Sequence, residues 1–125
     1  MLFEFNNGAP IYMQIVDKFK IAIISGELKS GERLPSVREL AVASQVNPNT
    51  MQKALGDLEA LGLIFTERTN GKFVTSDISL IDSYKQKYAE ELTHDYLKNM
   101  QSIGYSANDI IKQLEKFGGN KWIHY

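Results

Sequence analysis

Hydrophobic positions in the first part of the chain are spaced as in an amphipathic helix. After Pro10, apolar residues recur three or four positions apart: Ile11, Ile15, Phe19 and Ala22 or Ile23. This spacing predicts a helix that begins at Pro10 and is closed by Gly26. Two glycines and a proline follow in the segment 26–35, so the chain is expected to turn there and restart.

Two more helices are indicated by the residues at their starts. Ser36 and Glu39 have the S-x-x-E spacing of a capping box, which predicts a short second helix. Asn47 and Pro48 then form an N-cap and first-turn pair that opens a third helix, and Gly62 ends it. The buried face of this third helix is expected at Met51, Leu55, Leu58 and Leu61.

The segment that follows, LIFTERTNGKFVTS, alternates as a β-hairpin does. Asn70-Gly71 lies at its centre, and this dipeptide suits a type I′ turn because both residues tolerate positive φ. Three helices followed by a hairpin is the order of a winged helix-turn-helix. We therefore expect residues 1–77 to form such a domain.

The hydrophobic pattern of the last third of the chain predicts one long helix and one short helix. From about Ser79, apolar residues lie three or four positions apart until Gly104: Ile81, Tyr84, Tyr88, Leu92, Tyr96, Met100 and Ile103. Ser106 and Asp109 have capping-box spacing and predict a last helix, stopped by Gly118-Gly119. The predicted fold class is mostly α with a small β-hairpin.

These two C-terminal helices have little of their own chain against which to bury an apolar stripe. A two-helix hairpin of this size is not expected to be stable alone. We therefore interpret residues 78–125 as a helical dimerisation region, and tyrosine is a favoured residue at such interfaces. The predicted dimer interface consists of Ile81, Tyr84, Tyr88, Leu92 and Tyr96.

Composition narrows the class of protein only partly. The 125 residues are 43% hydrophobic, which is ordinary for one folded domain or a small domain with an appendage. The chain has no cysteine, no export signal and no apolar run of about 20 residues, so we expect a cytoplasmic protein that does not enter a membrane. The net charge is −1, so a nucleic-acid partner would have to be held by a local arrangement of cations.

The start of the predicted third helix carries side chains suited to reading DNA bases. Asn49, Thr50, Gln52 and Lys53 are the donors and acceptors in question. Asn and Gln can bond both edges of adenine, Thr can touch a thymine methyl, and Lys can bind guanine or phosphate. The competing interpretation is an ordinary exposed face whose polar side chains stay hydrated. The position of the helix in a winged helix-turn-helix favours DNA.

Arginine and lysine side chains near the predicted hairpin and second helix are candidates for phosphate contact. Arg68 and Lys72 lie at the base of the hairpin, where cations can hold phosphates or enter the minor groove. Arg38, in the first turn of the second helix, can reach a phosphate or guanine, or else pair with a nearby glutamate. Arg33 is a weaker candidate for phosphate.

The segment SGELKSGERLPSVRELAVASQVNPNTMQKALGDLEALGLIFTERTNGKFV resembles the DNA-binding domain of the GntR family of bacterial transcription regulators. The resemblance covers Pro10 to about Val74, and the short two-helix tail is similar to the small YtrA-like branch. It implies DNA contacts by Arg38, by Gly71 and by the residues early in the third helix: Asn49, Thr50, Gln52 and Lys53. The chain departs from the family at Pro48 and Gln52, where several members carry basic residues.

Three other interpretations of the sequence compete with DNA binding. Glu90 and His94 are four residues apart and could share a divalent metal, but a solvated helix face is the better interpretation because one His with carboxylates lacks the ligand count of known sites. An enzyme is not indicated, since the chain has two histidines, no cysteine and no phosphate-binding Gly-rich loop. A winged helix that binds protein instead of DNA stays open as the alternative.

The sequence thus predicts a sequence-specific regulator of transcription that binds double-stranded DNA. We expect a homodimeric repressor on a palindromic operator, with no cofactor and no bound metal. A small-molecule effector in the tyrosine-lined dimer region is a further hypothesis.

Overall fold

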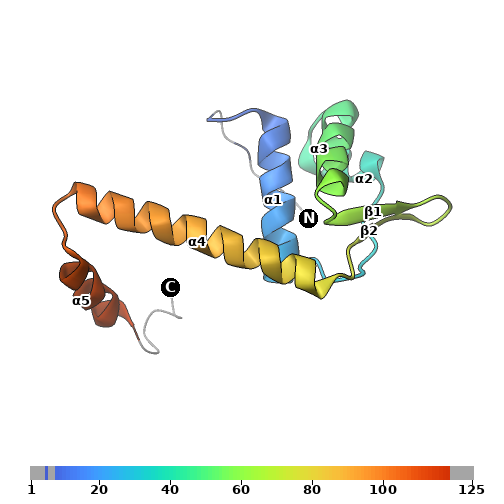
Figure 1. Ribbon diagram of the computed structural model, residues 1–125. Helices are drawn as coiled ribbons and strands as arrows, with labels where there is room; N and C mark the ends of the chain where they lie inside the picture. The colour runs from blue at the N-terminus through green and yellow to red at the C-terminus, as the bar shows by residue number, and fades with distance from the viewer. Residues whose placement is uncertain (1–4, 6–7, 119–125) are drawn as a thin grey trace. The chain divides into compact units, whose positions relative to one another are not determined.

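The computed structural model describes Phe5 and residues 8–118, which fold into five helices and one hairpin (Figure 1). The elements are α1 (Ile11–Ser25), α2 (Val37–Ser44), α3 (Pro48–Ala60), β1 (Ile64–Glu67), β2 (Gly71–Val74), α4 (Ile78–Ser102) and α5 (Ala107–Phe117). β1 and β2 pair antiparallel. The mostly helical fold class with a small hairpin is confirmed.

Contacts divide the chain into two units, one up to Lys85 and one from Gln86. This division falls inside α4, later in the chain than the boundary expected after Asp77. The beginning of α4 therefore belongs to the N-terminal unit, where Ile81 is buried and the Tyr84 hydroxyl donates a hydrogen bond to the Leu61 carbonyl oxygen at 3.0 Å.

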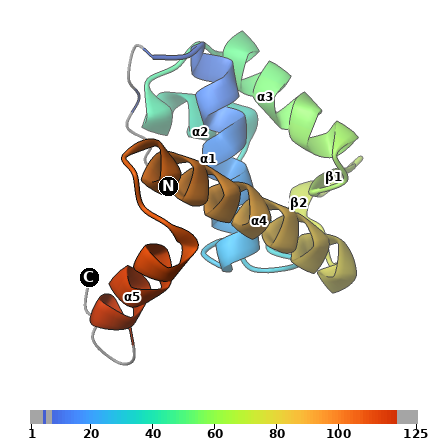
Figure 2. The same cartoon turned by 60° about the vertical axis from the view of Figure 1, so that its left-hand side comes forward.

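The core of the N-terminal unit lies between α1 and α3, which pack side by side (Figure 2). α2 and β1 also pack against α3. The largest side chains with almost no exposed surface are Phe19, Ile15 and Ile23 of α1, Met51, Leu55 and Leu58 of α3, and Leu63, Ile64 and Val74 of the hairpin region. These residues fix α3 from one side and leave its opposite face uncovered.

The predicted helix starts are confirmed, with one small shift. The Ser36 hydroxyl accepts from the Glu39 amide, and the Glu39 carboxylate accepts from the Ser36 amide. Ser106 and Asp109 make the same reciprocal pair at α5. The Asn47 side chain caps α3 by accepting from the Asn49 amide at 2.7 Å. Pro10 is the residue before α1 and not its first residue.

The predicted hairpin is confirmed, but its predicted turn type is wrong. Glu67 pairs with Gly71, so three residues, Arg68 to Asn70, connect the strands. Gly71 has φ 101°, whereas Asn70 is not at positive φ, as both residues of a type I′ turn would be. The strand register places Gly71 in β2, and this overrides the local preference of the Asn-Gly dipeptide.

The linker between α1 and α2 runs along β2 and forms backbone hydrogen bonds with it. The Leu34 amide donates to the Lys72 carbonyl oxygen, and the Val74 amide donates to the Glu32 carbonyl oxygen, each at 2.8 Å. Arg33 thereby forms a bridge opposite Phe73. This pairing holds the segment before α2 against the wing. None of the helices in residues 8–118 has the length and apolarity needed to cross a bilayer.

Gln45, which ends α2, has the left-handed backbone with φ 56° and ψ 44°. For a residue with a Cβ this conformation costs about 1–2 kcal/mol of free energy. Glycine adopts it without that strain and costs only about 0.5–1 kcal/mol, because it loses more conformational entropy on folding. We expect Gln45→Gly to raise the free energy of unfolding by about 0.5–1 kcal/mol, seen as a melting temperature a few degrees higher in thermal denaturation. Gln45→Ala keeps the Cβ and should show no gain; an equal gain in both variants would contradict the explanation.

Candidate nucleic-acid interface

The outer face of α3 carries the polar side chains that the sequence assigned to base reading. Asn49, Gln52 and Lys53 are exposed and Thr50 is half-buried. Residues three or four apart share one side of a helix, so Asn49 lies beside Gln52 and Lys53, away from the buried face. Within the described part of the chain, the side chains of Asn49, Thr50 and Gln52 make no hydrogen bond to protein. Their donors and acceptors are free for another molecule.

Lys53 has an aromatic partner that the sequence did not indicate. Its Nζ lies 3.8 Å from the centroid of the Tyr12 ring on α1. A cation this close to a ring face is held by a cation–π attraction of about 0.5–1 kcal/mol at an exposed site. The ammonium group remains at the surface, at the edge of α3 that faces α1.

Gly56 leaves the outer face of α3 flat one turn after Gln52. A Cβ built on Gly56 would meet no atom within 4 Å, so no neighbour in the folded chain requires glycine here. Glycine inside a helix costs about 0.5–1 kcal/mol relative to alanine. Glycine is used in spite of this cost where a helix must approach another molecule closely.

The wing lysine is engaged by α3. The Lys72 Nζ lies 2.5 Å from Glu59 Oε1 and 2.8 Å from Thr66 Oγ1. The Thr66 hydroxyl also donates a hydrogen bond to Glu59. The pKa of Glu59 is lowered, first by the hydrogen bond from Lys72 and then by that from Thr66, while burial acts to raise it. The sequence indicated Lys72 as a phosphate ligand, and the structure gives its ammonium group a carboxylate partner.

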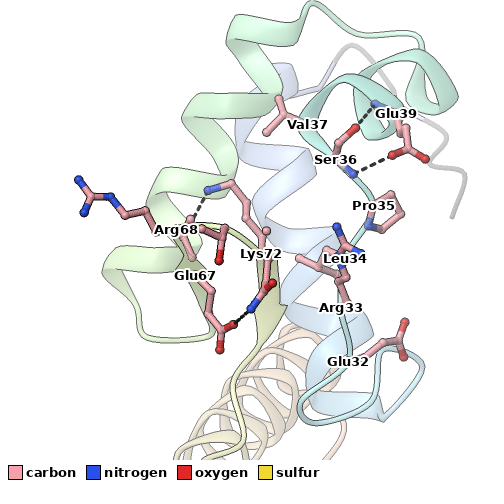
Figure 3. Close-up of a pocket in the computed structure, with 14 residues that line it drawn as sticks. Glu32, Arg33, Leu34, Pro35, Ser36, Val37, Glu39, Glu67, Arg68 and Lys72 are labelled. Atoms are coloured by element: carbon pink, nitrogen blue, oxygen red, sulfur yellow. Dashed lines mark hydrogen bonds between the residues drawn. The ribbon is translucent and has the colours of Figure 1, made fainter.

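Arg68 and Arg38 have no ion-pair partner among the described residues. Arg68 lies in the connection at the tip of the wing and not at its base, where the sequence placed it, and its side chain extends away from the others in Figure 3. Arg38 is exposed in the first turn of α2, and no pairing with a glutamate is formed there. Both guanidinium groups are therefore available to an anionic ligand.

A cleft with a volume of about 760 Å³ lies between the start of α2 and the wing (Figure 3). Its lining includes Arg33 and Arg68 together with the carboxylates of Glu32 and Glu67. The Arg33 guanidinium lies over Gly71, where Nε would be 3.5 Å from an added Cβ. This distance is an ordinary van der Waals contact, so the requirement for glycine at position 71 comes from its positive φ of 101°.

The predicted dimer residues fall into two groups. Ile81 and Tyr84 make contacts inside the N-terminal unit, as described above. Tyr88 is half-buried, and Leu92 and Tyr96 are exposed on the second unit. Further exposed apolar side chains in that unit are Leu97, Ile103, Ile111 and Leu114.

The acidic stretch of α4 does not assemble a metal site in the described residues. Glu90 and His94 line a shallow hollow with Lys87, Glu91 and Asp95, all from one helix. No group of three potential metal ligands is found within residues 8–118.

Comparison with known proteins places this chain in a family. Residues 11–74 match the model of the bacterial regulatory proteins of the gntR family. The uncharacterized HTH-type transcriptional regulator YhcF of Bacillus subtilis is 33% identical over 114 residues, which cover 91% of this chain and 94% of YhcF. The HTH-type transcriptional repressor YtrA of the same organism is 42% identical over 71 residues, 57% of this chain and 55% of YtrA.

Solved structures agree with this assignment. A GntR family transcriptional regulator from Listeria monocytogenes is 37% identical and superposes with a TM-score of 0.83 over 90% of this chain and 98% of that one. The AraR DNA-binding domain in complex with operator ORX1 is 25% identical, with a TM-score of 0.53 over 60% of this chain and 95% of that one.

Proposed function

Because the chain belongs to the GntR family of bacterial regulatory proteins, we propose that it represses transcription by binding a specific double-stranded DNA operator as a homodimer. The name of the YtrA relative, a transcriptional repressor, and the AraR domain bound to its operator support this proposal. DNA binding implies that the protein works in the cytoplasm, where a bacterial chromosome lies.

The observation that carries the proposal is the outer face of α3. Asn49 and Gln52 are exposed and Thr50 is half-buried, and these three uncharged side chains have no hydrogen-bond partner in the described chain. The major groove of B-DNA admits a helix and presents donors, acceptors and thymine methyls that such side chains recognise. Lys53 lies on the same face and adds a charge for guanine or phosphate.

Phosphate contacts are assigned to Arg38 on α2 and Arg68 on the wing. They lie on the two elements that flank α3, and phosphate contacts from both sides would fix the register of the reading helix. Gly71, whose positive φ of 101° shapes the end of the wing connection, is proposed to lie against the DNA, as the family resemblance implies. Lys72 takes part in holding the wing.

A homodimer is proposed through the unit that begins at Gln86. A stable interface needs a substantial apolar surface, and this unit exposes Leu92 and Tyr96 together with Ile111 and Leu114. Two copies would present two α3 helices to half-sites about 34–36 Å apart on a palindromic operator. A small-molecule effector bound between the two copies would change this spacing and so relieve repression.

The base-reading role of α3 is tested by Asn49→Ala and Thr50→Ala. We first select bound sequences from a random DNA pool with the wild-type protein. Each variant should then lose about 1–3 kcal/mol of discrimination at one base position in a gel-shift titration, because a base contact is removed. Asn99→Ala and Thr93→Ala make the same chemical changes on exposed positions of α4 and should retain the wild-type preference.

Two results would contradict this assignment. Unchanged base preference in both α3 variants would show that α3 does not read the operator. Failure of the wild-type protein to enrich any DNA, even at low salt where phosphate binding is strongest, would favour the protein-binding alternative.

A further inference from the structure

The charged cluster of Glu59, Thr66 and Lys72 joins the last turn of α3 to both strands of the wing. Thr66 on β1 and Lys72 on β2 are directly opposite in the strand register. The Glu59 carboxylate on α3 accepts hydrogen bonds from both side chains. One carboxylate therefore binds the two strands of the hairpin at once.

The cluster is partly shielded from solvent. The side chain of Lys72 is 15% exposed and that of Glu59 is 34% exposed. Two of the three donor protons of the Lys72 ammonium are directed to Glu59 and Thr66. A phosphate would have to compete with the Glu59 carboxylate, 2.5 Å away, for this ammonium group. Arg68 has no ion-pair partner among the described residues, so a phosphate could bind it without displacing a carboxylate.

The same cluster is well placed to set the angle of the wing. The hairpin has only two strands of four residues each, so it has few hydrogen bonds of its own with which to resist twisting. Linker pairing holds one edge of β2, where Leu34 donates to the Lys72 carbonyl oxygen and Glu32 accepts from the Val74 amide. The Glu59 cluster is a second attachment, on the side of α3.

We propose that Glu59 is a positioning residue that fixes the wing relative to α3 through Lys72 and Thr66, and that Lys72 serves DNA binding through this clamp and not as a phosphate ligand. This inference rests on the proposed function for its effect on DNA. The clamp itself is a property of the protein without DNA. Arg68 and Gly71 then meet the DNA at an angle set by Glu59.

The first test measures the clamp without DNA. We expect Glu59→Gln and Lys72→Met to accelerate amide hydrogen exchange in residues 64–74 of the full chain several-fold, because local opening becomes easier. Glu67→Gln removes another wing carboxylate, one that binds only Asn70 among the described residues, and should leave exchange at the wild-type rate. Wild-type exchange in both clamp variants would overturn the proposal, whether or not the protein binds DNA.

The second test separates a clamp from a phosphate contact by the salt dependence of DNA binding. If Lys72 positions the wing, Glu59→Gln and Lys72→Met should weaken binding by similar factors, roughly 3- to 30-fold. The slope of log K against log salt should stay unchanged, and the double variant should be no worse than either single variant. If Lys72 binds phosphate, Lys72→Met should reduce the slope by about 0.9, and Glu59→Gln should strengthen binding by removing a negative charge.

A third test exchanges the two charged residues and asks whether the wing attachment is restored. Glu59→Lys combined with Lys72→Glu keeps the net charge and can re-form the ion pair with its ends reversed. We expect each single exchange to weaken DNA binding and accelerate wing exchange, and the pair to recover most of both. A pair that binds DNA no better than Lys72→Glu alone would overturn the proposal.

Discussion

Phe19→Ala is expected to lower the free energy of unfolding by about 3–5 kcal/mol, the cost of removing a buried aromatic ring. Phe19 has no exposed surface and lies on α1, the helix that packs along α3. A domain of this size is stable by only about 5–15 kcal/mol, so this loss removes a large fraction of the total stability and should lower the denaturation midpoint strongly. Urea denaturation followed by circular dichroism, at one fixed protein concentration, measures the effect.

Ile21→Ala is the matched control for Phe19→Ala. Ile21 is on the same helix but is 41% exposed, so its truncation should cost about 1 kcal/mol or less. Equal losses in the two variants would show that the core is not centred on Phe19. The DNA affinity of Phe19→Ala should fall with its folded fraction, because α3 depends on α1 for its support.

If the proposed homodimer forms, Leu92→Glu is expected to convert it into a monomer and to weaken binding to a two-half-site operator by roughly 100-fold or more. A carboxylate cannot be buried without a partner at low cost, and Leu92 is 53% exposed in the single chain. Two linked DNA-binding domains bind a site with two half-sites about 10²–10⁴-fold more tightly than one domain does, and this gain disappears when the subunits separate. Sedimentation velocity and gel-shift titration measure the two effects.

Two comparisons show whether this loss comes from dimerisation. On a DNA fragment with a single half-site, Leu92→Glu and wild type should bind equally well. Ile21→Glu introduces the same charge at an exposed apolar position of α1 and should stay dimeric. A Leu92→Glu protein that sediments like wild type would place the interface elsewhere.

The helices of this protein could be predicted because their signals are local. Ser36 with Glu39 and Ser106 with Asp109 are each three residues apart, and their capping bonds form within the first turn of a helix. The hairpin could be predicted from alternation for the same reason. Its turn type was wrong because the strand register, which depends on the whole hairpin and the linker, decides which residues form the connection.

The partners of the candidate site residues could not be predicted, because they come from distant parts of the chain. Lys53 meets Tyr12 of α1, and Lys72 meets Glu59 of α3. A pattern of cations near a turn shows where positive charge lies and not what neutralises it. The stripe that includes Ile81 and Leu92 has the same limit, since a period of 3.6 residues does not distinguish packing within a chain from packing between two chains.

The lowered pKa of Glu59 determines how the wing attachment responds to acid. A carboxyl group whose pKa is depressed by folding adds stability above its ordinary value of about 4.3, and this contribution is lost only as the pH falls through the depressed value. Mild acidification of a bacterial cell therefore leaves the carboxylate ionised and the hairpin anchored. Any effect of mild acid on the proposed DNA binding is therefore not expected to come from loss of this attachment.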